Sequence, residues 1–113
     1  MTILVRAEIH GLAGRDAELR EVLRAHADAL ATAAGCEGAS VLTPLDAEHG
    51  EHVLEVTWRD ESSLREHYAT REYRRYTQAV SPLLAAPSDV VVHYVDRSVH
   101  PTADLAADPS RLG

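Results

Sequence analysis

The chain of 113 residues contains no Lys and no Phe, and it has one Cys, one Met and one Trp. All eleven basic residues are therefore Arg. Without Lys the protein cannot form a Schiff base with a substrate or use a lysine amine as a base. The single Cys36 excludes an intramolecular disulfide framework and a cysteine-based zinc site, and it is typical of a reducing compartment.

Long apolar runs are missing as well. No segment approaches the ~18 apolar residues that a transmembrane helix needs, and the first residues do not form a signal-peptide pattern. The formal net charge of −7 at pH 7 disfavours nucleic acid and anionic membranes as partners. We therefore expect a soluble cytoplasmic protein with one domain over residues 1–96, followed by an irregular tail over 97–113.

Hydrophobic periodicity outlines the secondary structure. Alternation with period two predicts strands over 2–9, 38–44, 52–58 and 89–95. Apolar positions at helical spacing predict a helix over 15–34, and Asp60 and Thr70 are placed to cap shorter helices over 61–68 and 71–84. This order predicts an α+β, ferredoxin-like fold, in which helices cover one face of a four-stranded antiparallel sheet.

The other face of the predicted sheet has no helix to cover it. It mixes apolar side chains with charged or titratable ones: Leu4, Val53, Val91 and Val95, with Arg6, Glu8, Glu55 and His93. Such a surface suits a second sheet better than water, so we predict a two-fold homodimer through the sheet faces. A solvated face is the alternative.

Four of the five aromatic residues lie within residues 55–76 together with a His. A core that needs only bulk would use Phe, whereas Trp, Tyr and His combine an apolar body with a polar tip, which suits a pocket. We predict that His67 is a catalytic base, since imidazole titrates near neutral pH. The alternative is a helix-edge histidine that hydrogen-bonds to the main chain or to a partner subunit. The predicted substrate-binding residues, each of which could instead serve only the core or its boundary, are Trp58, Tyr68, Tyr73, Tyr76 and His26.

No metal site is predicted. His49 and His52, in "HGEH", come nearest to one. The pair straddles a predicted hairpin turn, "DAEHG" (46–50), and has no third ligand nearby.

Four short pieces of sequence, in this order and spacing, resemble the antibiotic biosynthesis monooxygenase family. They are a turn containing Gly11 and Gly14, then "GCEGASVL" (35–42), "EVTW" (55–58) and "LREHYATREYRRY" (64–76). The resemblance covers about residues 2–96 and implies a dimeric α+β barrel. It also implies a range of activities: some members oxygenate anthrones or quinols with molecular oxygen and no cofactor, and others degrade haem or process small signalling molecules.

The residues distinguish between these branches. Where the haem-degrading members have an Asn, a Trp and a haem-ligating His, this chain has Ala7, His67 and Thr77. The best-understood anthrone oxygenases share Trp58, but their other three site residues correspond to Leu54, Leu64 and Gln78. The resemblance thus implies a monooxygenase without a cofactor that acts on a small aromatic intermediate of secondary metabolism (an anthrone, naphthol or quinol). A lyase, cyclase or isomerase acting in the same cleft and a non-catalytic ligand-binding protein remain alternatives.

Overall fold

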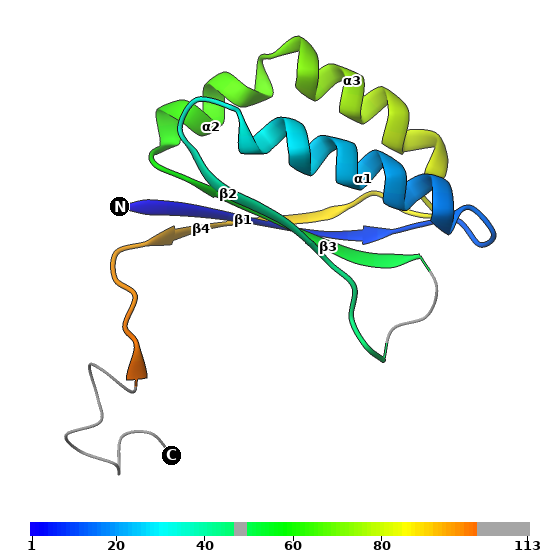
Figure 1. Ribbon diagram of the computed structural model, residues 1–113, viewed down its shortest axis with the longest axis horizontal. Helices are drawn as coiled ribbons and strands as arrows, with labels where there is room; N and C mark the ends of the chain where they lie inside the picture. Colours follow the sequence, from blue (N-terminus) through cyan, green and yellow to red (C-terminus); the bar gives the residue numbers. More distant parts are fainter. Residues whose placement is uncertain (47–49, 102–113) are drawn as a thin grey trace.

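The computed structural model describes residues 1–46 and 50–101. All of its helices lie on one side of a single four-stranded sheet (Figure 1). The elements are β1 (Thr2–His10), α1 (Asp16–Ala31), β2 (Cys36–Leu42), β3 (Glu51–Trp58), α2 (Glu61–Tyr68), α3 (Arg71–Val80), the 3-10 helix η1 (Ser81–Leu83) and β4 (Asp89–Val95). The strand order is β2-β3-β1-β4 with every neighbouring pair antiparallel, so the predicted ferredoxin-like α+β fold is confirmed.

The predicted caps of the two short helices are present. An oxygen of the Asp60 carboxylate accepts a hydrogen bond from the Ser63 N–H at 2.8 Å, and the Thr70 hydroxyl accepts one from the Tyr73 N–H at 3.2 Å. Each bond satisfies an otherwise free donor in the first turn of its helix. The caps thereby fix where α2 and α3 begin and which side chains they turn toward the sheet.

Two predicted helix ends were wrong. The first helix ends at Ala31 rather than 34, because the chain then turns at Thr32 and passes through Gly35, which has a φ of +81°. The third ends at Val80 rather than 84, because Pro82 has no N–H to continue the α-helical ladder and the chain tightens into η1. The predicted second strand runs over 36–42 instead of 38–44. Part of the predicted hairpin turn (47–49) and most of the predicted tail (102–113) lie outside the described residues.

The hydrophobic core lies between the sheet and the helices. Strand pairing places Ile3 opposite Trp58 and Val5 opposite Val56, so these side chains share the helix-facing side. Leu19 and Leu23 of α1 pack onto that side and are fully buried. Trp58 is only 1% exposed, although it closes the last strand before α2. Trp58 therefore connects the core to the start of the segment that leads into α2.

Within residues 1–46 and 50–101, none of the helices named above covers the opposite side of the sheet (Figure 1). Arg6 and Glu55 stand opposite each other there and form an ion pair. Val53 is buried on this face, whereas Val91 is 47% exposed. The predicted mixture of apolar and charged side chains is thus on one surface. The homodimer itself stays a prediction.

We expect Gly35→Ala to destabilise the protein by about 2–4 kcal/mol. The φ of +81° disfavours any L side chain, and an added Cβ would lie 2.1 Å from the hydroxyl oxygen of buried Ser63. Gly14→Ala is the matched control, since Gly14 has a φ of +80° but nothing within 4 Å of the added atom, so it should cost only about 1 kcal/mol. Urea unfolding measures both, and equal losses would contradict the steric argument.

Candidate active site

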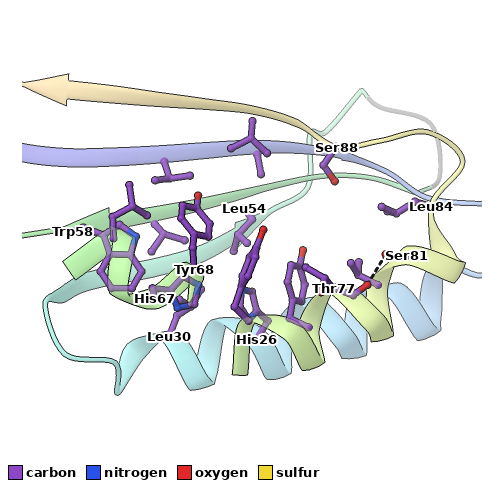
Figure 2. A pocket seen from close by; sticks show the side chains of 18 residues that line it. His26, Leu30, Leu54, Trp58, His67, Tyr68, Thr77, Ser81, Leu84 and Ser88 are labelled. Atoms are coloured by element: carbon purple, nitrogen blue, oxygen red, sulfur yellow. Dashed lines mark hydrogen bonds between the residues drawn. The ribbon is translucent and has the colours of Figure 1, made fainter. Parts of the chain in front are cut away.

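A cavity of about 200 Å³ lies between the helices and the sheet. In Figure 2, Trp58 lies at one end of it and Leu84 and Ser88 at the other, with His67 and His26 between them. All six residues predicted for the site contribute to its lining: His26, Trp58, His67, Tyr68, Tyr73 and Tyr76. They come from four different elements, β3 and the three α-helices. The structure thus brings them together, while their roles in binding and chemistry stay predictions.

His67 is at the centre of the aromatic group. Its ring centroid lies 5.0 Å from that of Trp58, 5.3 Å from Tyr73, 5.7 Å from Tyr68 and 5.8 Å from His26. Burial lowers the pKa of the His67 imidazole from its ordinary value of 6.5. Over residues 1–46 and 50–101 no hydrogen bond engages either of its ring nitrogens. A neutral ring with both nitrogens unengaged can accept a proton from a bound ligand.

His26 and Tyr76 form a stacked pair along the cavity wall. Their centroids are 3.7 Å apart and their planes differ by 7°. His26 is 7% exposed, and burial, assisted by the neighbouring His67, lowers the pKa of its imidazole to about 4. Burial, assisted by Tyr73, raises the pKa of the Tyr76 phenol to about 12. Both rings are therefore uncharged at neutral pH.

The buried neutral His26 predicts acid sensitivity. Between pH 6.5 and about 4 the unfolded chain binds a proton at this residue that the folded protein does not, so stability falls as pH falls through this window. The full shift corresponds to at most about 3 kcal/mol, and contact of the ring edge with water reduces this to about 2 kcal/mol. His26→Gln should remove that part of the loss when urea unfolding is compared at pH 7 and pH 4.5. His93→Gln, on the opposite face of the sheet, should keep the wild-type dependence of stability on pH. If His26→Gln also keeps it, His26 is not the cause of the acid sensitivity.

Hydroxyl groups line the other end of the cavity. Thr77 and Ser81 stand one helical turn apart, and Ser88 precedes β4. The Thr77 hydroxyl donates to the carbonyl of Arg74 at 2.9 Å, and the Ser81 hydroxyl donates to the carbonyl of Thr77 at 2.5 Å. The sequence does not predict Ser81 or Ser88 at the site. The only local signal was the i, i+4 spacing of Thr77 and Ser81, and Ser88 lies in a loop whose position depends on tertiary structure.

Both ring nitrogens of His52 are engaged by hydrogen bonds within the fold, so neither is available to bind a metal. One ring nitrogen, Nε2, lies 2.7 Å from a carboxylate oxygen of Asp16, and Nδ1 lies 2.8 Å from the hydroxyl of Thr43. These bonds link the first turn of α1 to β3 and to the segment after β2. His49, the other histidine of "HGEH", lies outside the described residues. Within the described ranges no group of three or more His, Cys, Asp or Glu could hold a metal, and no helix there is long and apolar enough to cross a membrane.

The fold and the cavity together define an α+β protein of the ferredoxin-like class with an aromatic pocket between sheet and helices. The chain belongs to the antibiotic biosynthesis monooxygenase family, whose sequence profile matches residues 2–79. The resemblance of the four sequence pieces is thereby confirmed. No protein with a curated description matches the chain.

Solved structures agree on the fold. Rv0793 from Mycobacterium tuberculosis superposes with a TM-score of 0.80 at 25% identity, over 88% of this chain and 100% of that one. A proposed antibiotic biosynthesis monooxygenase from Nitrosomonas europaea reaches 0.80 at 14% identity, over 88% and 94% of the two chains. A mutant of SnoaB, a cofactor-independent oxygenase from Streptomyces nogalater, reaches 0.77 at 17% identity, over 87% and 96%. At 14% and 17% sequence identity, the similarity to the last two structures shows a shared fold and no more.

Proposed function

We propose that this protein is a monooxygenase of secondary metabolism that needs no cofactor and oxidises an electron-rich hydroxyaromatic compound with molecular oxygen in the cytoplasm. Anthrones, naphthols and quinols are the candidate substrates. The observation that carries the proposal is His67: a half-buried imidazole, unengaged by hydrogen bonds within the described residues, surrounded by aromatic rings in a largely apolar cavity. Membership in the family and the likeness to SnoaB support it.

His67 would begin the reaction by taking a proton from the bound substrate. Because burial lowers its pKa, the imidazole is neutral and able to accept that proton at physiological pH. The phenols of Tyr68 and Tyr76, whose pKa values burial raises, stay protonated and can donate hydrogen bonds to the developing oxyanion. The apolar walls keep water away from the electron-rich anion.

The anion then passes an electron to molecular oxygen, and the substrate radical and superoxide combine into a peroxide. The proton held by His67 returns to the peroxide. His67 then takes the second C–H proton from the same carbon as the C=O bond forms and the O–O bond breaks, and the departing hydroxide receives that proton and leaves as water. For an anthrone, one substrate and one O₂ give one quinone and one water, so electrons and atoms balance. Every proton movement in this scheme uses His67, and the substrate itself is the reductant.

The proposal includes a homodimer joined through the free faces of the two sheets. The exposed apolar area around Val91 beside the Arg6–Glu55 ion pair supports it, since such a face suits a second copy with matching charges. Light scattering on the purified protein should give twice the chain mass of 12.3 kDa. A mass of one chain at micromolar concentration would refute this part of the proposal.

Oxygen uptake tests the proposed activity. Purified protein, stripped of metals with a chelator, is mixed with anthrones, naphthols and quinols, and the spontaneous oxidation rate is subtracted. We expect uptake that survives chelation, with one O₂ consumed per substrate. Substrate consumption under nitrogen would indicate a lyase, cyclase or isomerase, and binding without turnover would indicate a ligand-binding protein. Either result would refute the proposal.

A further inference from the structure

Building on this proposed function, we propose that the cavity accepts hydroxyaromatic substrates without a carboxylate. A decarboxylation, or esterification of the acid, would then have to precede this enzyme in its reaction sequence. Two features carry the inference: the absence of a cation in the described lining of the cavity, and the orientation of the hydroxyl groups at one end of it.

The described lining of the cavity offers a carboxylate no positive charge. Among the described residues that line it there is no Arg, Asp or Glu, although the chain has eleven Arg in all. Its two imidazoles, His26 and His67, have pKa values lowered by burial and are neutral at pH 7. An ionised carboxylate buried without a cation loses its hydration with no compensating ion pair, which is strongly unfavourable.

Two of the three hydroxyl groups at this end of the cavity, those of Thr77 and Ser81, present acceptors to a ligand. Because Thr77 and Ser81 donate their hydroxyl protons to the carbonyls of Arg74 and Thr77, their oxygens keep only lone pairs for a ligand. A phenolic O–H can donate to these oxygens. A carboxylate, which has only acceptor atoms, would be repelled by them. The phenols and imidazoles of the lining are hydrogen-bond donors, and they suit a ketone.

Among the described residues around Tyr68, the rim gives a carboxylate no better partner. Tyr68 and Val90 line the cavity while remaining 40% and 49% exposed, so they form an uncharged edge. Arg65 lies one turn before Tyr68 on α2, but it is already paired with Glu61 at 2.8 Å. The net charge of −7 adds a weak long-range repulsion of anions. A substrate acid would therefore be disfavoured both inside the cavity and at its edge.

Three ligands of matched shape test the inference: 1,8-dihydroxyanthrone, its 3-carboxylic acid and the methyl ester of that acid. Binding is measured anaerobically by titration calorimetry, so that no turnover is needed, and quenching of Trp58, the only Trp, locates the ligand. We expect the parent and the ester to bind alike and the acid at least 30-fold more weakly. Acid and ester binding within threefold of each other would overturn the inference. If the ester bound no better than the acid while the parent bound tightly, the size of the substituent and not its charge would explain the weak binding of the acid. That result would also overturn the inference.

A positive charge introduced at the hydroxyl end should weaken the preference for the ester over the acid. Ser88→Arg is expected to reduce the difference between acid and ester at least tenfold, whereas Ser88→Gln, long but neutral, should leave it unchanged. An unchanged difference in a folded Ser88→Arg protein would count against the inference; if that variant does not fold, Ser81→Arg is used in its place. Selective binding of neutral ligands without oxygen uptake would refute the proposed oxygenase function alone. Oxygen uptake with equal use of acid and ester would refute the selectivity alone.

Discussion

Replacing His67 with Gln is expected to lower kcat for oxygen uptake about 10²–10³-fold while the protein stays folded. Gln has a comparable volume and can still form hydrogen bonds, but it cannot take a proton at neutral pH. The imidazole is half-buried and makes no hydrogen bond within the described residues, so its loss should change the free energy of unfolding by less than about 1 kcal/mol. Oxygen uptake, circular dichroism and thermal unfolding of the same preparations separate the two effects.

The pH profile gives an independent check on this assignment. His67 must be neutral to accept a proton, and burial puts its pKa below 6.5. Wild-type kcat should therefore be level around pH 7 and decline only as the pH falls below 6.5, and His67→Gln should lose that dependence. His26→Gln is the matched comparison, because it makes the same substitution 5.8 Å away in the same cavity, and it should cost less than tenfold. A His67→Gln rate within threefold of wild type would rule out the base.

The sequence predicted which aromatic and histidine residues belong to the site, but not how their rings pack against one another. Period-two alternation assigned Trp58 to the inner face of its strand, and the Asp60 cap set the helix on which His67 lies; both were local signals. The stacking of His26 on Tyr76 joins residues fifty positions apart, and no local pattern encodes it. The depressed pKa of His26 follows from that burial, so it too could be found only in the folded structure.

The hydroxyl end of the cavity illustrates a second limit. Helical spacing continued past Val80 in the sequence, and Pro82 turned the chain into η1 instead. Ser81 still has helical φ and ψ values, with its N–H on the Thr77 carbonyl, and it lines the cavity while its hydroxyl bonds to the same carbonyl. The change to η1 matters for the lining residues that follow, Leu84 and Ser88, whose positions a helix extended to 84 would not have predicted.

Trp58→Ala is expected to destabilise the protein by about 3–5 kcal/mol. The indole is 1% exposed and belongs to the core cluster as well as to the cavity wall, so its removal leaves a large void next to an existing one. Strand β3, which carries Trp58, is held by its pairing with β1 and β2, so its backbone cannot collapse far into that void. Urea unfolding at pH 7 measures the loss, and a value under about 1.5 kcal/mol would show that the site relaxes instead.

Trp58→Phe distinguishes the core role of this residue from its role in the cavity. Phe keeps most of the apolar volume but loses the indole N–H and part of the ring that lies 5.0 Å from His67. We expect it to cost about 1–2 kcal/mol of stability and to raise KM for an aromatic substrate several-fold, with kcat reduced less than in His67→Gln. If KM and kcat both stay at wild-type values in the folded Phe variant, Trp58 serves the core alone. Substrate recognition would then rest on the rings of α2 and α3.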